Sequence, residues 1–290
     1  MKKFIKNILV FIIILFIINI PLRHITNIYY FNQYEKVDLN YKTYLFSDSH
    51  GAALENLTEK YNTYNFSTGS DSYVDILNKI NYLIKNSKIK QVIITADDHT
   101  LSKYREKMNN TDRSAYYKII TNVRPFKEYL KTINYKYIKR NFVFVNIKSR
   151  DIINSYFKSK IKSKNRINKS WNDLTKNEKS KKCLDRFNFQ FENYNSSKKL
   201  TSTLLNIIKT CNDNNIKITA IKYPITNIYN KTIGTNNFKA DSIFKSNGIN
   251  VIDFKNLYAK NDIFFYDQDH LNEKGSAKFT NVLFNKIHLP

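Results

Sequence analysis

Two short segments of this chain contain the residue types that an acyl-transfer centre requires. Residues 46–51 have the sequence Phe-Ser-Asp-Ser-His-Gly and place Ser49 directly after a strand-like run. Residues 267–270 have the sequence Asp-Gln-Asp-His, which puts the acid of Asp267 three positions before His270, just ahead of a helical pattern. A serine nucleophile needs a base to accept its proton, and the base needs a carboxylate to fix its tautomer. If the two segments meet in space, the chain has the parts of a Ser-His-Asp centre.

Each segment also has a purely structural interpretation. Ser47 or Ser49 can cap the helix that follows, because a serine hydroxyl accepts a hydrogen bond from the first helical turn. Asp269 or Asn272 can likewise cap the last helix and leave the His270 loop solvated. Three of the five histidines of the chain fall at predicted strand ends or in the closing loop: His50, His99 and His270. Their joint position favours the catalytic hypothesis.

Strand-like and helix-like patterns alternate along the chain and predict an α/β fold. Apolar runs predict strands at 41–47, 64–66, 90–96, 142–147, 216–223 and 249–254. Amphipathic spacing and terminal caps predict helices at 52–61, 73–86, 114–133 with an interruption near Arg124-Pro125, 197–212, 236–247 and 272–287. This alternation is typical of a parallel sheet with helices on both faces, where sites form beyond the carboxyl ends of strands. Several polar segments would lie at that edge: 48–51, 67–70, 97–100 and the residues after Pro224.

The N-terminal residues predict a membrane anchor. Residues 4–22 are mostly apolar, and Ile8–Ile18 contains no polar residue. Three lysines precede the run Ile8–Ile18, whereas Arg23 is the only basic residue that closely follows it. This difference predicts a cytoplasmic N-terminus and an outside location for the rest of the chain. A cleaved signal peptide is the alternative, but no small-residue cleavage pattern follows. We therefore predict a single-pass protein of the bacterial cell membrane: an anchor at 1–23, a linker at 24–40, and an extracellular or periplasmic domain at 41–290.

The chain is strongly basic, with a formal net charge of +24 from 48 basic and 24 acidic residues. The composition of an AT-rich bacterial genome accounts for much of this. The alternative is attraction to an anionic surface, such as lipid headgroups, a teichoic-type polymer or acidic polysaccharide. Nucleic acid is not expected as a partner, because no binding motif accompanies the charge. The basic region 148–194 is predicted to be an insertion: a flap over the site, a partner-binding segment or a plain surface excursion.

The two chemical segments resemble the first and last sequence blocks of the SGNH (GDSL-type) hydrolases. In that family the serine after the first-block aspartate is the nucleophile, and the last block is Asp-x-x-His followed by a helix. The resemblance implies that Ser49 is the nucleophile, His270 the general base and Asp267 its orienting acid. It also implies a flavodoxin-like, three-layer α/β/α domain with a mainly parallel sheet. The order of elements matches over most of residues 41–287, although the specific motifs are only two short blocks.

The oxyanion side of the site follows the family pattern less closely. The family's second block supplies an oxyanion glycine, and Gly69, in a Ser-Thr-Gly-Ser turn, is at a suitable place. The first block usually begins with glycine where Ser47 stands, and the third block, Gly-x-Asn-Asp, is replaced by Ala-Asp-Asp-His at 96–99. His99 can donate an N–H in place of the missing asparagine; a structural role for His99 is the alternative. His50, beside the nucleophile, is expected to line the site.

This mechanism needs neither a metal nor a cofactor, and no Cys/His grouping has the spacing of a zinc site. Metal-assisted or phosphodiester hydrolysis is nevertheless an alternative, through Asp97, Asp98, His99 and Asp267. The two cysteines, Cys183 and Cys211, can pair in an oxidising compartment or remain lone thiols, because their spacing decides neither.

An anchored protein with this resemblance is expected to act on acyl esters of the cell envelope. Relatives with this layout, as the resemblance implies, remove or transfer O-acetyl groups on polysaccharide or take part in D-alanyl transfer to teichoic acid. The first hypothesis is therefore a serine esterase or O-acyltransferase that works through an acyl-serine on envelope polysaccharide or a teichoic-type polymer. A transferase would also need a membrane protein as acyl donor. The second hypothesis is a non-catalytic polymer-binding or assembly protein on the same fold.

Overall fold

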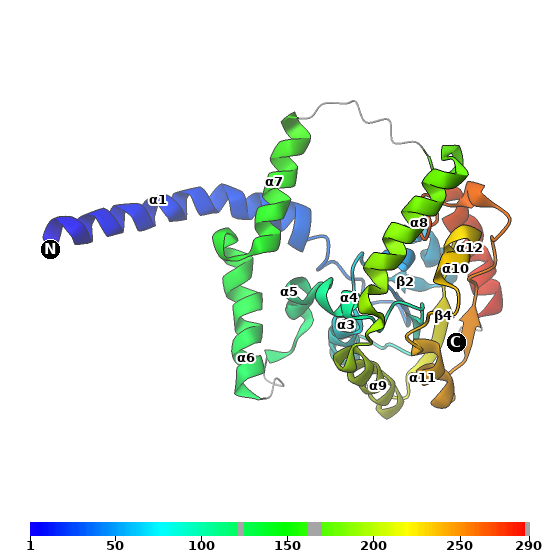
Figure 1. The fold of residues 1–290 in the computed structure, drawn as a ribbon. Helices are drawn as coiled ribbons and strands as arrows, with labels where there is room; N and C mark the ends of the chain where they lie inside the picture. The colour runs from blue at the N-terminus through cyan, green and yellow to red at the C-terminus, as the bar shows by residue number, and fades with distance from the viewer. Residues whose placement is uncertain (121–124, 162–169, 288–290) are drawn as a thin grey trace. The chain divides into compact units, whose positions relative to one another are not determined.

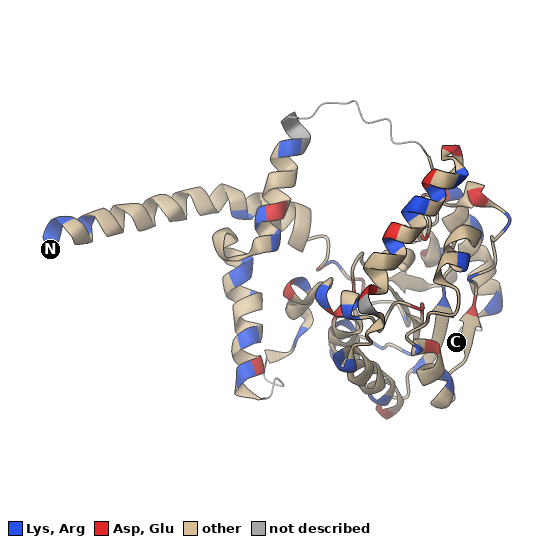
Figure 2. Ribbon diagram, in the orientation of Figure 1, with Lys and Arg blue, Asp and Glu red and all other residues tan. Residues whose placement is uncertain are grey.

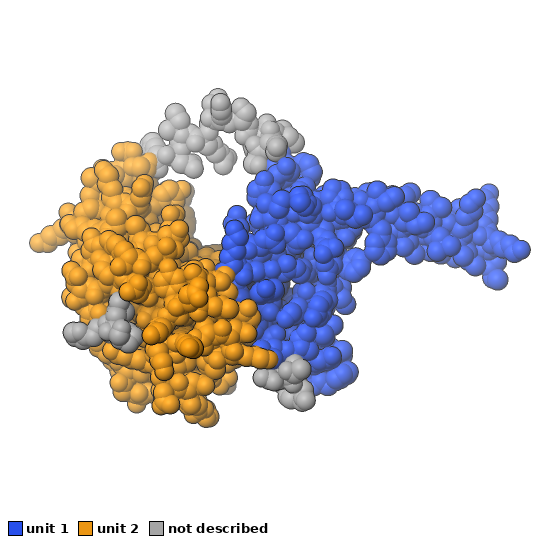
Figure 3. All heavy atoms as spheres, turned by 180° about the vertical axis from the view of Figure 1, so that it is seen from behind, with its two compact units in different colours: residues 1–36, 111–167 blue, residues 37–110, 168–290 orange. Residues whose placement is uncertain are grey.

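The computed structural model of the protein covers most of the chain. It describes residues 1–120, 125–161 and 170–287, apart from the side chains of residues 159–161 and 193. The chain forms two compact units, coloured separately in Figure 3: unit 1 comprises residues 1–36 and 111–167, and unit 2 comprises residues 37–110 and 168–290. Unit 2 contains the sheet, and unit 1 contains the long N-terminal helix.

Unit 2 is built on a five-stranded parallel sheet. Its strands are β1 (Thr43–Phe46), β2 (Thr63–Asn65), β3 (Gln91–Thr95), β4 (Lys217–Lys222) and β5 (Val251–Asp253). Their order across the sheet is β2-β1-β3-β4-β5, and every neighbouring pair is parallel. This is the order of flavodoxin-like doubly wound sheets, in which the direction of winding reverses between β1 and β3. The predicted α/β fold with a parallel sheet is confirmed (Figure 1).

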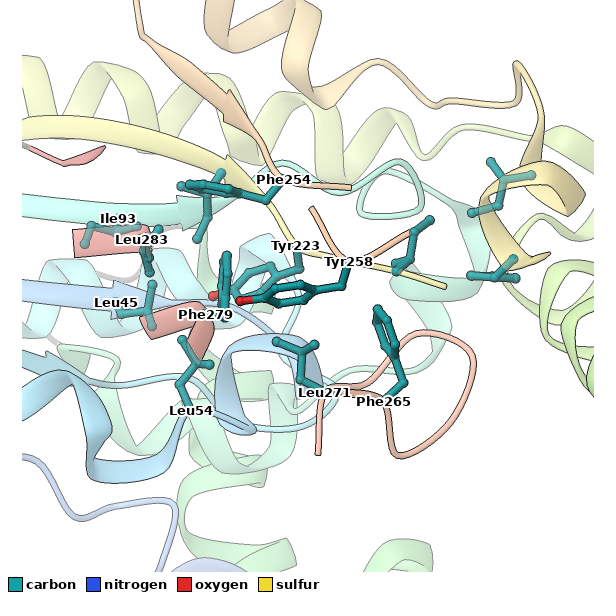
Figure 4. Packing of buried hydrophobic residues seen from close by; sticks show 14 of the residues in the cluster. Leu45, Leu54, Ile93, Tyr223, Phe254, Tyr258, Phe265, Leu271, Phe279 and Leu283 are labelled. Atoms are coloured by element: carbon teal, nitrogen blue, oxygen red, sulfur yellow. The ribbon is translucent and has the colours of Figure 1, made fainter. Parts of the chain in front are cut away.

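Helices cover both faces of the sheet. The helices of unit 2 are α2 (Ser49–Ala52), α3 (Tyr73–Asn86), α4 (Lys103–Lys107), α8 (Lys176–Gln190), α9 (Lys198–Asp213), α10 (Asn227–Ile233), α11 (Ala240–Ser246) and α12 (Glu273–Lys286). Phe279 and Leu283 of α12 share one core with Leu45 and Ile93 of the strands (Figure 4). Successive strand residues point to opposite faces, so Val92 faces away from this core. Helices α3 and α9 pack against each other on that other face.

One predicted strand is wrong, and several helices were not predicted, among them α4, α8 and α10. Residues 142–147 do not join the sheet: Val143–Val145 is a 3-10 turn and Ile147 begins α7 (Ile147–Ile161). A short apolar run has the same sequence pattern whether it enters a sheet or packs against a helix, and here it packs against the N-terminal helix. Helix α10 follows β4 in a stretch where the sequence predicted no element.

Unit 1 consists of helices and turns. Its helices are α1 (Lys2–Thr26), α5 (Thr111–Ser114), α6 (Phe126–Ile133) and α7, with π-helical turns at Asn27–Phe31 and Asn134–Lys139. Together with the turn that follows it, α1 runs to Phe31 and is long and apolar enough to cross a membrane, a property that secretion signals share. The side chain of Asn19, inside the apolar part of α1, donates to the carbonyl of Asn141 at 2.8 Å and accepts the N–H of Val143 at 3.0 Å.

The predicted insertion spans both units. Residues 148–161 belong to α7 in unit 1, α8 belongs to unit 2, and residues 162–169 lie outside the described part of the chain. In sequence, the second segment of unit 1 separates β3 from β4, so the sheet unit is built from two stretches of chain. The predicted boundaries of anchor, linker and domain stay a prediction. Both cysteines are buried free thiols.

Candidate active site

Ser49 lies in a tight turn after β1. Asp48 caps the short helix α2, because its carboxylate accepts the N–H of His50 at 3.1 Å. Gly51 has no room for a side chain: a Cβ there would lie 2.7 Å from the hydroxyl of Tyr223. This close packing fixes the turn at the carboxyl edge of the sheet and leaves Ser49 partly exposed.

A short loop before α12 presents His270. Phe265 and Leu271 form an antiparallel bridge across the loop, and both side chains enter the core beneath it (Figure 4). Gly275, in the first turn of α12, lets the loop approach the helix, because a Cβ there would overlap the carbonyl oxygen of Phe264. The loop is therefore held from both sides, and the position of His270 is set by packing.

The structure brings Ser49, His270 and Asp267 together. Ser49 Oγ lies 2.8 Å from His270 Nε2, although the two residues are 221 positions apart. On the other side of the ring, His270 Nδ1 lies 2.9 Å from each carboxylate oxygen of Asp267. These distances allow a proton to pass from the serine to the imidazole while the carboxylate fixes the tautomer. All three residues are partly exposed, so a substrate can reach them.

Gly69 lies beside the serine. A Cβ at Gly69 would be 3.9 Å from the Cβ of Ser49. The carbonyl of Gly69 accepts a hydrogen bond from Asn110 at 2.9 Å, and the same amide group donates to Asp71 at 2.7 Å. The next residue, Ser70, has a φ of 70°, a conformation that surrounding contacts must hold. The turn that carries Gly69 is thus fixed next to Ser49.

His50 belongs to a buried layer next to the base. Its Nδ1 lies 2.7 Å from Asp97 Oδ2, and its Nε2 lies 3.6 Å from Asp269 Oδ2. Its ring centroid is 5.2 Å from that of His270. Only 4% of His50 is exposed. The structure therefore places His50 against the ring of His270 and out of reach of bulk solvent.

His99 follows β3 and contacts Asp48. Its Nε2 lies 3.0 Å from Asp48 Oδ2, and Arg105 Nη2 donates to the same oxygen at 2.7 Å. Burial lowers the pKa of His99, which favours the neutral form of the ring. Within the described residues no hydrogen bond joins His99 to Ser49 or Gly69. The predicted role of His99 as an oxyanion donor therefore has no supporting contact, whereas the structural alternative has one.

The charges in this buried layer compensate one another. Burial opposes the ionisation of Asp48, but the positive charges of Arg105 and His50 outweigh it and hold the pKa of this carboxyl well below its usual range. Burial also disfavours a charged His50, yet the carboxylates of Asp48 and Asp97 raise its pKa well above the usual value. Asp97 in turn accepts the backbone N–H of Tyr223 at 2.8 Å, which ties the end of β3 to the end of β4.

Asp269 is a second acid at the base, and its role was missed from the sequence. Its Oδ1 lies 3.3 Å from His270 Nδ1, while its Oδ2 accepts from Arg186 at 2.8 Å and from Gln190 at 3.1 Å. Burial lowers the pKa of His270, but its hydrogen bonds with Asp267 and Asp269 raise it to about 9. The resting base therefore carries a proton at neutral pH.

A sequence signal for Asp269 existed but was weak. Arg186 and Gln190 are four positions apart and so lie on one face of α8, within the region that was treated as an insertion. The capping alternative also holds in part, because Asn272 caps α12 through the N–H of Gly275 at 2.9 Å. The cap is Asn272, which leaves Asp269 available to the base.

Comparisons with known proteins show only a remote likeness. No family model and no curated protein matches the chain. Among solved structures, the chain is similar to a "putative acylhydrolase" from Bacteroides fragilis, with 12% sequence identity and a TM-score of 0.40, over 89% of this chain and 95% of that chain. At this level of similarity the likeness bears on neither the fold nor the reaction.

Among the residues that the structure describes, two groups of side chains have the geometry to hold a metal ion: His50, Asp269 and His270, and Asp48, His50 and Asp97. In each group the ligand atoms lie within 4.8 Å of one another. The metal set considered from the sequence is not assembled, because Asp98 is bound by Lys222 at 2.6 Å and by Lys255 at 2.9 Å.

A pocket of about 860 Å³ borders the acid side of the three residues. Asp267 lies on its wall with Tyr266, whose side chain is exposed, and Trp171, which packs beneath it. Lys182 and Lys274 add positive charge to the rim. A pocket of this size can accommodate a ligand as large as a short saccharide.

Proposed function

We propose that the chain is a serine-dependent ester hydrolase or O-acyltransferase of the SGNH type. The observation that carries this proposal is the 2.8 Å contact of Ser49 Oγ with His270 Nε2, together with Asp267 at the other ring nitrogen. A serine, an imidazole and a carboxylate in this sequence of contacts are the working parts of nucleophilic acyl transfer. Their position at the carboxyl edge of the sheet, beside the β1/β3 switch point, is where ligands bind in such sheets.

In the proposed reaction, Ser49 Oγ attacks the ester carbonyl while His270 Nε2 accepts the serine proton. His270 keeps its Nδ1–H, which donates to Asp267. The backbone N–H groups of Ser49 and Gly69 stabilise the oxyanion; Ser49 begins α2, and the first N–H groups of a helix have no partner inside it. The alkoxy C–O bond then breaks, and His270 returns the proton to the leaving alcohol. An acyl-Ser49 remains.

The second half of the reaction releases the acyl group. His270, now neutral, accepts a proton from water or from a sugar hydroxyl, whose oxygen attacks the acyl-serine carbonyl. The Ser49 C–O bond breaks, and the proton on His270 returns to Ser49. Water gives a hydrolase, whereas a sugar hydroxyl gives a transferase that would need an acyl donor in the membrane.

We infer that the substrate is an acyl ester, with acetyl as the first candidate, on envelope polysaccharide or a teichoic-type polymer. Three observations support this: the apolar α1, the basic charge of the chain, and the large pocket beside Asp267, whose lining includes the exposed ring of Tyr266 and two lysines. The proposed location is the bacterial cell membrane, with the sheet unit outside. Exposed aromatic rings stack on sugars, and lysines attract an anionic polymer.

A non-catalytic polymer-binding protein is the second candidate, because one observation favours it. The family's third-block asparagine is absent, and His99, which takes its place, is bound to Asp48. The oxyanion would then have backbone donors alone, and such a centre could turn over slowly or not at all.

The test is hydrolysis of a chromogenic acetyl ester by the full chain in detergent, together with fluorophosphonate labelling. Ser49→Ala should abolish both, whereas Ser202→Ala, an exposed serine on α9, should change neither. Hydrolysis that persists in Ser49→Ala would contradict the enzyme assignment. Polymer binding by the wild type, without labelling, would instead establish the second candidate.

A further inference from the structure

We propose that residues 125–158 of unit 1, here called the membrane platform, lie in the lipid–water interface of the bilayer that α1 spans, with the turn 142–147 inserted among the acyl chains. This inference rests on the proposed anchor and extends it, because the predicted anchor comprises residues 1–23 alone. The platform comprises α6, the π-helical turn Asn134–Lys139, the 3-10 turn Val143–Val145 and the first part of α7.

The turn 142–147 contacts α1 within the apolar part of that helix, and this contact sets the depth of the turn in the proposed bilayer. The ring of Phe142 packs edge-on against Phe16, with centroids 5.9 Å apart. Phe16 precedes Arg23, the first charged residue after the apolar run, by seven positions, which is about 10 Å along the helix axis. If α1 crosses the bilayer with Arg23 at the surface, Phe142 lies well below that surface.

The backbone of the turn is suited to an apolar environment. A polypeptide can enter lipid only if its N–H and C=O groups are paired within the protein. Asn19 of α1 accepts the N–H of Val143 and donates to the carbonyl of Asn141. The N–H of Phe142 donates to the carbonyl of Ile138 at 2.9 Å, and two further N–H groups are paired inside the turn. An asparagine inside an apolar span is expensive unless it is bound in this way.

The surface of the platform is apolar where the turn projects. Large apolar and aromatic side chains that are 40–70% exposed within the platform are Phe126, Leu130, Tyr137, Ile138, Phe142, Phe144, Val145, Ile147 and Phe157. Within the turn, Ile147 is 65% exposed. A bilayer would cover apolar side chains that are exposed in this way, and four of them, Phe142, Phe144, Val145 and Ile147, belong to the turn. Figure 1 shows α7 running across the C-terminal end of α1, which it contacts, and this is the direction expected of a helix that lies in the membrane plane.

Polar residues surround this apolar surface as they do in interfacial helices. Eight basic and two acidic residues lie between positions 125 and 158, and Figure 2 shows lysine and arginine along α6 and α7. Each basic side chain near anionic headgroups contributes about 1 kcal/mol of attraction. Tyr29, just beyond the span, packs against Tyr156 of α7 with centroids 5.2 Å apart. Tyrosines are common at the level of the headgroups.

A groove between α1 and the turn has one apolar wall and one polar wall, which match the acyl chain and the headgroup of a lipid. Its volume is about 320 Å³. Phe16, Ile20 and Phe142 form its apolar wall, and Arg23 and His24 form its polar wall. An acyl chain fits along the first wall and a phosphate headgroup against the second.

The proposal is tested by measuring depth in the full chain, reconstituted into nanodiscs of phosphatidylcholine and phosphatidylglycerol. Single cysteines at Ile13→Cys, Val145→Cys and Leu205→Cys are labelled with a nitroxide; Leu205, on α9, is exposed and apolar but belongs to unit 2. The native thiols are buried, and the parent protein serves as the labelling control. Accessibility to oxygen, which concentrates in bilayers, is compared with accessibility to an aqueous nickel chelate. Ile147→Cys repeats the test within the turn.

We expect the oxygen-to-nickel ratio at Val145 and Ile147 to be several-fold above that at Leu205 and to approach that at Ile13. A ratio at Val145 and Ile147 equal to that at Leu205, with Ile13 in lipid, would overturn the platform and leave the anchor intact. An aqueous ratio at Ile13 would overturn the anchor and the platform together. The esterase measurements on Ser49→Ala are independent of all these outcomes.

Discussion

His270 Nδ1 lies 3.3 Å from Asp269 Oδ1, so the base is in contact with the carboxylate of its own neighbour in the chain as well as with Asp267. Two carboxylates beside one ring nitrogen stabilise the protonated, charged imidazole relative to the neutral one. The arrangement that positions the proposed base therefore also holds a proton on it. The reactivity of Ser49 should depend on removing that proton.

The first prediction is an alkaline rise in activity. Only neutral His270 can accept the serine proton, and its pKa is raised to about 9, so kcat/KM for a chromogenic ester should increase with pH and level off above that value. The same raised pKa stabilises the fold below the unfolded histidine pKa of about 6.5, and this contribution is lost as the pH rises through 9. A profile of kcat/KM between neutral and alkaline pH measures the midpoint. A midpoint near 6.5 would show that the two acids do not act on the ring.

The second prediction separates the two acids. Asp269→Asn removes a buried charge from Arg186, so unfolding in denaturant should become easier by roughly 3–5 kcal/mol. The midpoint of the pH profile should also move to lower pH. Asp267→Asn, at the exposed acid, should leave stability nearly unchanged and reduce kcat by about 10²–10⁴. Equal loss of kcat with equal stability in both variants would contradict these separate roles.

The third prediction concerns two glycines that frame Ser49. Gly51→Ala puts a methyl group 2.7 Å from the hydroxyl of Tyr223 and should destabilise unit 2 by about 1–3 kcal/mol. Gly69→Ala meets only an ordinary contact, 3.9 Å from the Cβ of Ser49, and should keep its stability. Its methyl group would nevertheless occupy space beside the nucleophile and lower kcat/KM by up to roughly 100-fold. Thermal unfolding and ester hydrolysis of the two variants give the comparison.

The fourth prediction is sensitivity to acid. The pKa values of Asp48 and Asp269 are held well below the usual range, in both cases by positive neighbours that outweigh burial. A carboxyl with a depressed pKa adds stability above its unfolded value of about 3.9, and this is lost as the pH falls through the folded pKa. Unfolding by denaturant should therefore become easier below about pH 4. Asp48→Asn should weaken this dependence, and an unchanged slope in that variant would refute the assignment.

The sequence predicted best where the signal is local. The bounds of α3 are those predicted, because Asp75 accepts the N–H of Ser72 at 2.9 Å and closes a capping box before an amphipathic run. Ser49 and His270 were also found, since both follow from strand-end position and from motifs. The order β2-β1-β3-β4-β5 could be expected only through the family resemblance.

The parts that could not be predicted depend on distant partners. The apolar run at 142–147 has a strand pattern, and its contacts with Phe16 and Asn19, far away in the chain, show that it packs against a helix. Asp269 has the spacing of a helix cap, but its Oδ1 lies 3.3 Å from His270 Nδ1, and Arg186, distant in the chain, holds its other oxygen. His99 lies where an oxyanion donor was expected, but it contacts the buried side chains of Asp48 and Arg105 instead. The periodicity of the sequence does not show that these three side chains meet.

The hydrogen bonds of Asn19 give α1 a part in the assembly of unit 1, in addition to its proposed role as a membrane anchor. A foreign span of equal length and hydropathy would keep the protein at the membrane, but it would leave the N–H of Val143 and the carbonyl of Asn141 without their partners. Anchors that act only as tethers are interchangeable between proteins, whereas the proposed anchor α1 also binds the turn 142–147 through Asn19. Retention in the membrane and correct assembly of unit 1 are therefore separable by a chimera, in which the first survives and the second fails.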